Sequence, residues 1–172
     1  MFIEYNPNPV GRYDVGDCAI RAISKALGET WEDSYLRLCV AGFMMGDLPN
    51  SDSVFGAILR QNGFKKKTIP DTCPDCYTVE DFARDHPRGV FVLGLGGHVV
   101  TIVDGDIYDM TNSSKGIPVY YWYKDEITQE RDNGATERDV LLSTPTPIST
   151  ASAGTINAVP ADCATAKPAT AK

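Results

Sequence analysis

Apolar residues recur at helical spacing through the first half of the chain. The clearest stripe lies between Asp17 and Leu27 and stops at Gly28, a residue type that commonly ends helices. Its members are Ala19, Ile20, Ile23, Ala26 and Leu27. The pattern predicts an amphipathic helix over about 17–27 with its apolar face toward a core.

Three further helices are predicted before Pro87. One begins after Thr30, where Thr-Trp-Glu-Asp resembles a capping box, and one spans about 51–62. The last begins after Thr78 and ends by His86, because the residue before a proline avoids the helical conformation.

From Gly89 onward the pattern becomes that of strands. Valine, isoleucine and aromatic residues predict strands over 90–95, 98–103, 107–109 and 119–123, with Asp104-Gly105 as a tight turn. Helices followed by strands predict an α+β fold in which N-terminal helices pack on a C-terminal antiparallel β-sheet. The lysine run 65–67 is predicted to be a solvated strand edge.

Composition limits both the folded length and the class of protein. Residues 144–172 are rich in Ala, Thr and Pro and bury too little to offset their ordering entropy, so we predict one domain over 1–143 and a disordered tail over 144–172. A net charge of -7 argues against nucleic acid as a partner. The lack of a long apolar stretch or secretory signal predicts a cytoplasmic protein with no membrane partner.

The cysteines do not indicate a metal centre. Their number, five, is odd and no secretory signal accompanies them, which disfavours a disulfide framework. Cys73-Pro-Asp-Cys76 has the spacing of only half a zinc site, so we interpret it as a turn, with a reversible disulfide as the alternative. No metal and no cofactor are expected.

Cys18 is the candidate nucleophile. It lies in the first turn of the predicted helix, where unpaired N–H groups and the helix dipole favour a thiolate. At 100° per residue it also points away from the apolar stripe. The alternative interpretation is a small buried residue at a helix start.

His98 is the candidate base, and it follows glycines that we expect to leave room for a substrate backbone. If Asp104-Gly105 is a two-residue turn, Asp109 becomes the diagonal neighbour of His98 on the next strand. A one-residue change of register would instead place Asn112 opposite His98. The alternative interpretation is a core histidine with satisfied hydrogen bonds.

Together these residues would form a nucleophilic triad. Asp109 would orient His98, His98 would take the Cys18 proton, and the thiolate would attack a carbonyl. The backbone N–H of Cys18 would bind the oxyanion, with Asn8 or Asn6 as helper; Asn-Pro-Asn-Pro is also a plain turn signal.

The order of these motifs resembles the papain-like cysteine peptidase superfamily. The motifs are Asn-Pro-Asn-Pro, Val-Gly-Asp-Cys-Ala-Ile-Arg-Ala-Ile-Ser, Gly-His-Val-Val-Thr-Ile-Val-Asp-Gly and Ile-Tyr-Asp-Met, within about residues 5–124. The nearest form is a small phage and gut-bacterial branch similar to the bacteriocin-leader peptidases. The resemblance implies that Cys18, His98 and Asp109 are catalytic. It departs at Arg12, where the superfamily usually has a Gln.

The sequence therefore predicts a cysteine-dependent peptidase or amidase that acts on a peptide or isopeptide carbonyl of a peptide or protein substrate. One alternative is a phage-encoded binding module on the same fold without catalysis. Another is a thiol acyltransferase or deamidase.

Overall fold

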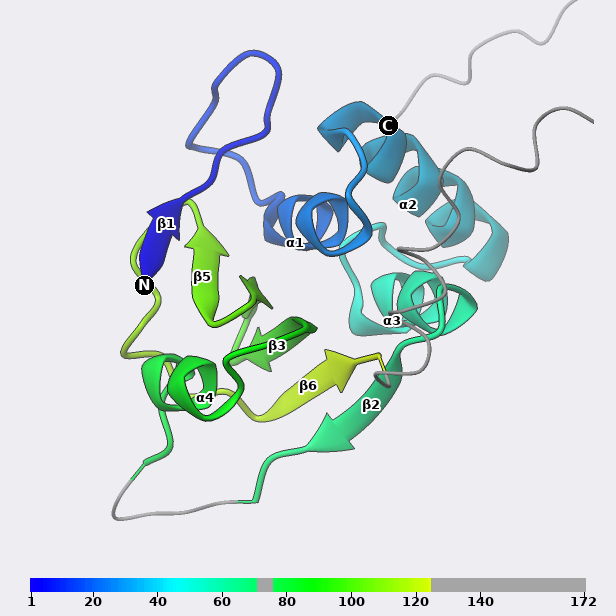
Figure 1. Cartoon of the computed structure of the whole chain (residues 1–172). Coiled ribbons are helices and arrows are strands. Elements are labelled where there is room, and N and C mark those ends of the chain that lie inside the picture. The colour runs from blue at the N-terminus through cyan, green and yellow to red at the C-terminus, as the bar shows by residue number, and fades with distance from the viewer. Residues whose placement is uncertain (71–75, 125–172) are drawn as a thin grey trace, which may run out of the picture. The chain divides into compact units, whose positions relative to one another are not determined.

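The computed structural model describes residues 1–70 and 76–124 (Figure 1). The predicted tail over 144–172, the predicted domain end at residue 143, Cys73 and Cys163 lie outside these residues. The described residues form an α+β fold with four helices and a six-stranded mixed sheet.

The helices lie where the apolar periodicity and the capping signals predicted them. They are α1 (Cys18–Leu27), α2 (Trp31–Met45), α3 (Asp52–Gln61) and α4 (Val79–Asp85). Gly28 ends α1 in the left-handed conformation, and Thr30 caps α2 by accepting the backbone N–H of Asp33. Thr78 and Asp81 form a complete capping box on α4.

The sheet has the strand order β1-β5-β4-β3-β6-β2. The strands are β1 (Phe2–Glu4), β2 (Lys65–Thr68), β3 (Val90–Leu95), β4 (His98–Val103), β5 (Asp106–Asp109) and β6 (Tyr120–Tyr123). The exposed lysine run is the edge strand β2, as predicted.

The prediction of a purely antiparallel sheet was wrong at the opposite edge. The short strand β1 pairs in parallel with β5, with Phe2 beside Ile107 and Glu4 beside Asp109. The other pairings are antiparallel. Three residues are too few to show the alternation of a strand, so the pairing of β1 depends on the vacant edge of β5.

Two apolar cores lie on the two faces of the sheet. On one face α1 and α3 pack against β3, β4 and β6, through Ile20, Ile23, Phe55, Val99 and Trp122 among others. On the other face α4 packs through Phe82 against Phe91, Leu93 and Ile102. Figure 1 shows the three longer helices on one side of the sheet and α4 on the other.

A close approach between β3 and β6 fixes the position of Tyr120. A Cβ atom at Gly94 would overlap the Tyr120 ring, so the glycine makes room for this ring. Space for a substrate backbone at this glycine, expected from the sequence, is therefore taken by Tyr120. Gly96 and Gly97, in the turn before His98, have open space where a Cβ would lie.

We predict that Gly94→Ala destabilises the fold by about 1–3 kcal/mol, because the added methyl group forces the Tyr120 ring away. Thermal unfolding followed by circular dichroism would measure the loss. Gly96→Ala is the matched control and should leave the melting temperature nearly unchanged. Equal melting temperatures for the two variants would contradict the packing described here.

Candidate active site

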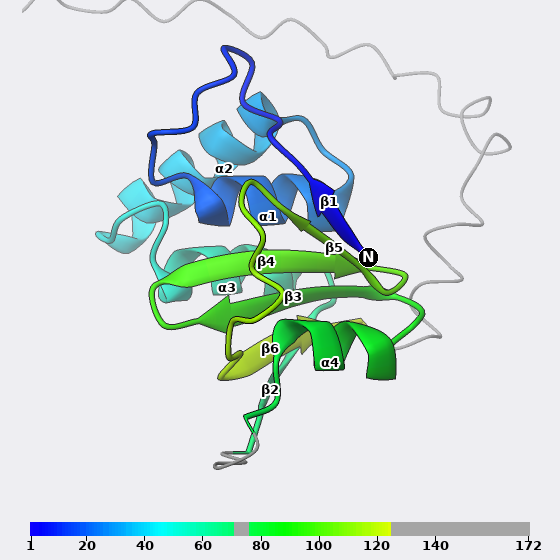
Figure 2. The same ribbon diagram turned by 90° about the vertical axis from the view of Figure 1, so that its left-hand side faces the viewer.

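Cys18 is the first residue of α1, in the helical turn that the sequence predicted. The next apolar residues of the helix, Ala19, Ile20 and Ile23, are buried in the core, whereas Cys18 is only partly buried. The rotation of the helix therefore presents the thiol at the edge of the core. In Figure 2 the first turn of α1 lies above the start of β4.

His98 begins β4 and is bonded to the carboxylate that the hairpin register predicted. Asp104 (φ 50°) and Gly105 (φ 80°) form the turn, and Val103 pairs with Asp106. This register brings His98 Nε2 to 2.7 Å from Asp109 Oδ2. Since Nε2 is bonded to Asp109, Nδ1 is the ring nitrogen that remains available to another partner.

Cys18 and His98 shift each other's pKa. Burial acts to raise the pKa of Cys18, but the hydrogen bond and charge of His98, with the backbone N–H groups of Val99 and Ala19, bring it below its ordinary value. The hydrogen bond to Asp109, followed by that to Cys18, raises the pKa of His98 to about 10. Both directions favour a thiolate–imidazolium pair at neutral pH.

The three predicted triad residues line one cavity of about 200 Å³. Its other lining residues are Val15, Gly16, Asp17, Arg21, Gly97 and Met110. The side chain of Asp109 is 5% exposed and that of His98 is 35% exposed. The Asp109 carboxylate is thus shielded from solvent, while the His98 imidazole remains accessible.

The other predicted site residues lie elsewhere. Asn8 Nδ2 points to Asp17 Oδ2 at 3.5 Å, and Asn6 Nδ2 donates to the carbonyl of Arg12. Neither asparagine lines the cavity of Cys18. Asn112, the alternative third member, is exposed and its Oδ1 accepts hydrogen bonds from Ser114 instead of His98.

Sequence reasoning missed a buried ion pair beside Cys18. Asp17 and Arg21 are 4% and 5% exposed, and Arg21 Nε lies 2.6 Å from Asp17 Oδ1. Trp31 Nε1 donates to the other carboxylate oxygen of Asp17 at 2.9 Å. The opposite charges at positions i and i+4 of one helix were the available signal for the pair. No spacing rule indicated Trp31, because it belongs to the next helix.

Tyr120 is a second residue near the Cys18 thiol that the sequence did not indicate. Its hydroxyl donates to Asp52 Oδ2 at 2.6 Å and so joins β6 to the start of α3. Burial, this hydrogen bond and the nearby Cys18 charge hold the pKa of Tyr120 above its ordinary value. Tyr120 therefore stays protonated, as a hydrogen-bond donor, at neutral pH.

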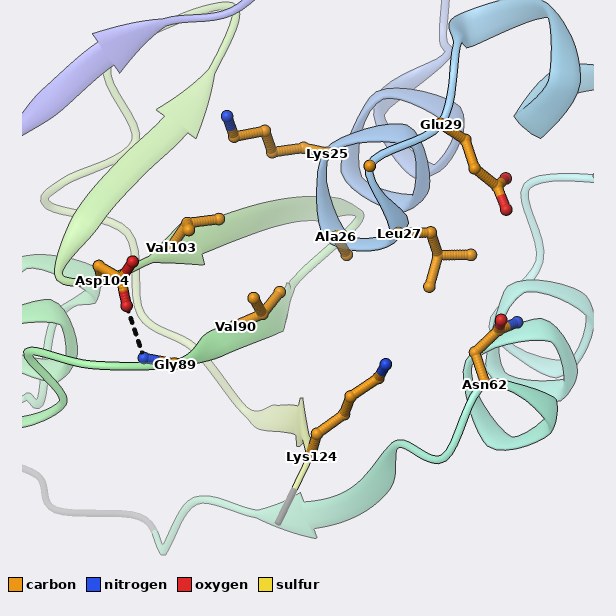
Figure 3. Close-up of a pocket in the computed structure, with 11 residues that line it drawn as sticks. Lys25, Ala26, Leu27, Glu29, Asn62, Gly89, Val90, Val103, Asp104 and Lys124 are labelled. Carbon is orange, nitrogen blue, oxygen red and sulfur yellow. Dashed lines mark hydrogen bonds between the residues drawn. The ribbon is translucent and has the colours of Figure 1, made fainter. Parts of the chain in front are cut away.

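A larger cavity, of about 630 Å³, lies around the other end of α1 (Figure 3). It is lined by Leu27 and Gly28 of that end, by Lys25 and Lys124, and by Asp104, whose Oδ1 accepts the N–H of Gly89. None of the triad residues lines it. A helix of ten residues is about 15 Å long, so this cavity is remote from the Cys18 thiol.

Within residues 1–70 and 76–124, no group of three or more His, Cys, Asp or Glu side chains is placed to hold a metal ion. In the same ranges, none of the helices combines the length and the apolarity that a membrane span requires. Cys76 is exposed in the described part, whereas Cys73, with which it would form the alternative reversible disulfide, lies outside the described residues.

Comparison with known proteins gives no relative: no family model, no curated protein and no solved structure matches the chain.

We predict that the His98 ring of the native protein stays protonated up to about pH 9, because its pKa is raised to about 10. An ordinary histidine loses this proton near pH 6.5. Asp109→Ala should bring the His98 pKa down toward 6.5, since the bond to Asp109 is the largest cause of the shift. Titration of the ring carbons by NMR would measure this, with His86→Gln used for assignment. A His98 titration near pH 6.5 in the unsubstituted protein would contradict the pairing.

Proposed function

We propose that this protein is a papain-like cysteine hydrolase that cleaves a peptide or isopeptide bond. The observation that carries the proposal is the hydrogen bond of 2.7 Å between His98 Nε2 and Asp109 Oδ2, in a cavity that Cys18 also lines and where His98 lowers the pKa of the Cys18 thiol. A nucleophile that begins a helix, a base that begins a strand and an orienting carboxylate on the next strand also support the papain-like assignment.

In the proposed reaction the Cys18 thiolate attacks the carbonyl carbon of the substrate. The backbone N–H of Cys18, in the helical turn whose N–H groups lack intrahelical partners, faces the developing oxyanion. The His98 imidazolium gives its proton to the leaving amine, and a thioester remains on Cys18. Neutral His98 then takes a proton from water, which hydrolyses the thioester and restores the thiolate.

The pKa shifts set the pH range of this mechanism. Acylation needs the thiolate and the imidazolium together. The thiolate forms as pH rises through the lowered Cys18 pKa, and the imidazolium is lost as pH rises through about 10. We therefore expect activity across neutral pH, with loss on both the acid and the alkaline side.

One observation favours a second candidate, a binding module that retains the fold but does not turn over substrate. Arg12 occupies the position of the superfamily's glutamine, and its guanidinium pairs with exposed Asp14. Asn6 and Asn8 are bonded to other residues of the N-terminal loop and to Asp17. The loop thus offers no side-chain amide to the Cys18 cavity, although its residues Val15, Gly16 and Asp17 line that cavity.

We predict that iodoacetamide alkylates Cys18 at least about tenfold faster than Cys39 near pH 6, because a thiolate is the attacking species. Mass spectrometry of digests would resolve the two sites, which are both partly buried. His98→Ala should remove the excess. Equal rates at Cys18 and Cys39 would argue against an activated nucleophile.

Turnover is tested with a synthetic peptide library and mass-spectrometric detection of new termini. We expect cleavage by the full-length protein, none by Cys18→Ala, and a loss of about 10²–10⁴-fold in His98→Ala. Tyr13→Ala, an exposed substitution that does not line the cavity, should cleave normally. A reactive Cys18 without any turnover would favour the binding module.

A further inference from the structure

A second cavity lies beside that of Cys18 and has a different chemistry. Its volume is about 390 Å³, and Val15, Gly16 and Asp17 line both cavities. A single short segment of chain, directly before the nucleophile, therefore borders both spaces. An extended peptide advances only about 3.3 Å per residue, so one that crosses this segment reaches both.

Apolar and aromatic side chains form most of the wall of this second cavity. Ile20 comes from α1, Trp31 and Tyr35 from α2, and Pro9 and Val10 from the N-terminal loop. The Trp31 and Tyr35 rings are stacked, with centroids 4.8 Å apart and planes 14° apart. Val10 is 76% exposed and Tyr35 41%, so a bound apolar group would cover surface that now faces water.

Asp17 contacts one residue from the wall of each cavity. One carboxylate oxygen accepts from Trp31 Nε1, while the other lies against Arg21 Nε. Arg21 lines the Cys18 cavity, and Trp31 lines the apolar one. The indole is thus held on the residue that precedes the nucleophile, a fixed platform of the kind that positions a ligand relative to a reacting group.

We propose that the cavity of Trp31 and Tyr35 is a substrate subsite that takes a large apolar or aromatic side chain of the peptide attacked by Cys18. This inference rests on the proposed function and adds to it a substrate class. Arg12 lines this cavity, and its charge is neutralised by the ion pair with Asp14. It therefore does not oppose the binding of an apolar side chain. The volume of the cavity accommodates a phenylalanyl or leucyl side chain.

Binding is measured without turnover in the full-length Cys18→Ala protein. The probes are short acetylated peptide amides of Gly and Ser, each with a single Phe placed at a different position, and the parent peptide without Phe. Tryptophan fluorescence reports the cavity, because Trp31 lines it and the second tryptophan, Trp122, is buried at 1% exposure. We expect the best Phe peptide to bind about tenfold more tightly than the parent.

A matched pair of tyrosine variants assigns the binding to this cavity. Tyr35→Ala, in the same Cys18→Ala background, should abolish the advantage of the Phe peptide. Tyr13→Ala removes the same number of atoms from a 56% exposed ring outside the cavity and should retain it. Equal binding of Phe and parent peptides, or equal losses in the two variants, would overturn the subsite.

A second readout connects the subsite to the nucleophile. In the unsubstituted protein the best Phe peptide should slow alkylation of Cys18 by iodoacetamide but leave the rate at Cys39 unchanged. Tight binding without protection of Cys18 would overturn the subsite as well. Failure of the proposed function gives a different result, in which Cys18 without peptide reacts no faster than Cys39 while the Phe peptides still bind.

Discussion

The packing of α1 against the sheet is the constraint on which the rest of the structure depends. Ala19 and Ile23 are buried in the core, and Thr101 of β4 donates from Oγ1 to the backbone carbonyl of Ala22 at 2.9 Å. Apolar contacts alone would allow a helix to slide and rotate, whereas a buried hydrogen bond with one geometry does not. The helix is thereby set so that its first residue, Cys18, lies beside the first residue of β4.

The β4–β5 hairpin supplies the other half of the site by a constraint that is purely local. Positive φ angles at Asp104 and Gly105 are those of a two-residue turn whose twist matches paired strands. That turn sets the register, and a slip of one residue would turn Asp109 to the other face of the sheet. The hydrogen bond of His98 to Asp109 is therefore a consequence of turn chemistry several residues away.

The charges around the thiol are arranged so that each has a partner. Asp109 is compensated by His98, and buried Asp17 is compensated by Arg21 and by the indole N–H of Trp31. An uncompensated carboxylate next to Cys18 would oppose a thiolate, whereas a paired one does not. The same Asp17 pairings connect the cavity of Cys18 with the neighbouring cavity of Trp31.

The sequence by itself determined the features that depend on neighbouring residues. Helical periodicity and glycine or threonine caps located α1 to α4, and the Asp104-Gly105 turn with strand alternation brought Asp109 to His98. Tertiary structure decided what requires distant segments to meet. The parallel pairing of β1, the Tyr120 ring over Gly94 and the contact of Trp31 with Asp17 were of this kind. Within the N-terminal loop, the packing also decided that Asn6 bonds to Arg12 and Asn8 to Asp17. A polar side chain forms a hydrogen bond with whichever complementary group the packing brings within about 3 Å. The spacing of residues along the sequence does not indicate which group that will be.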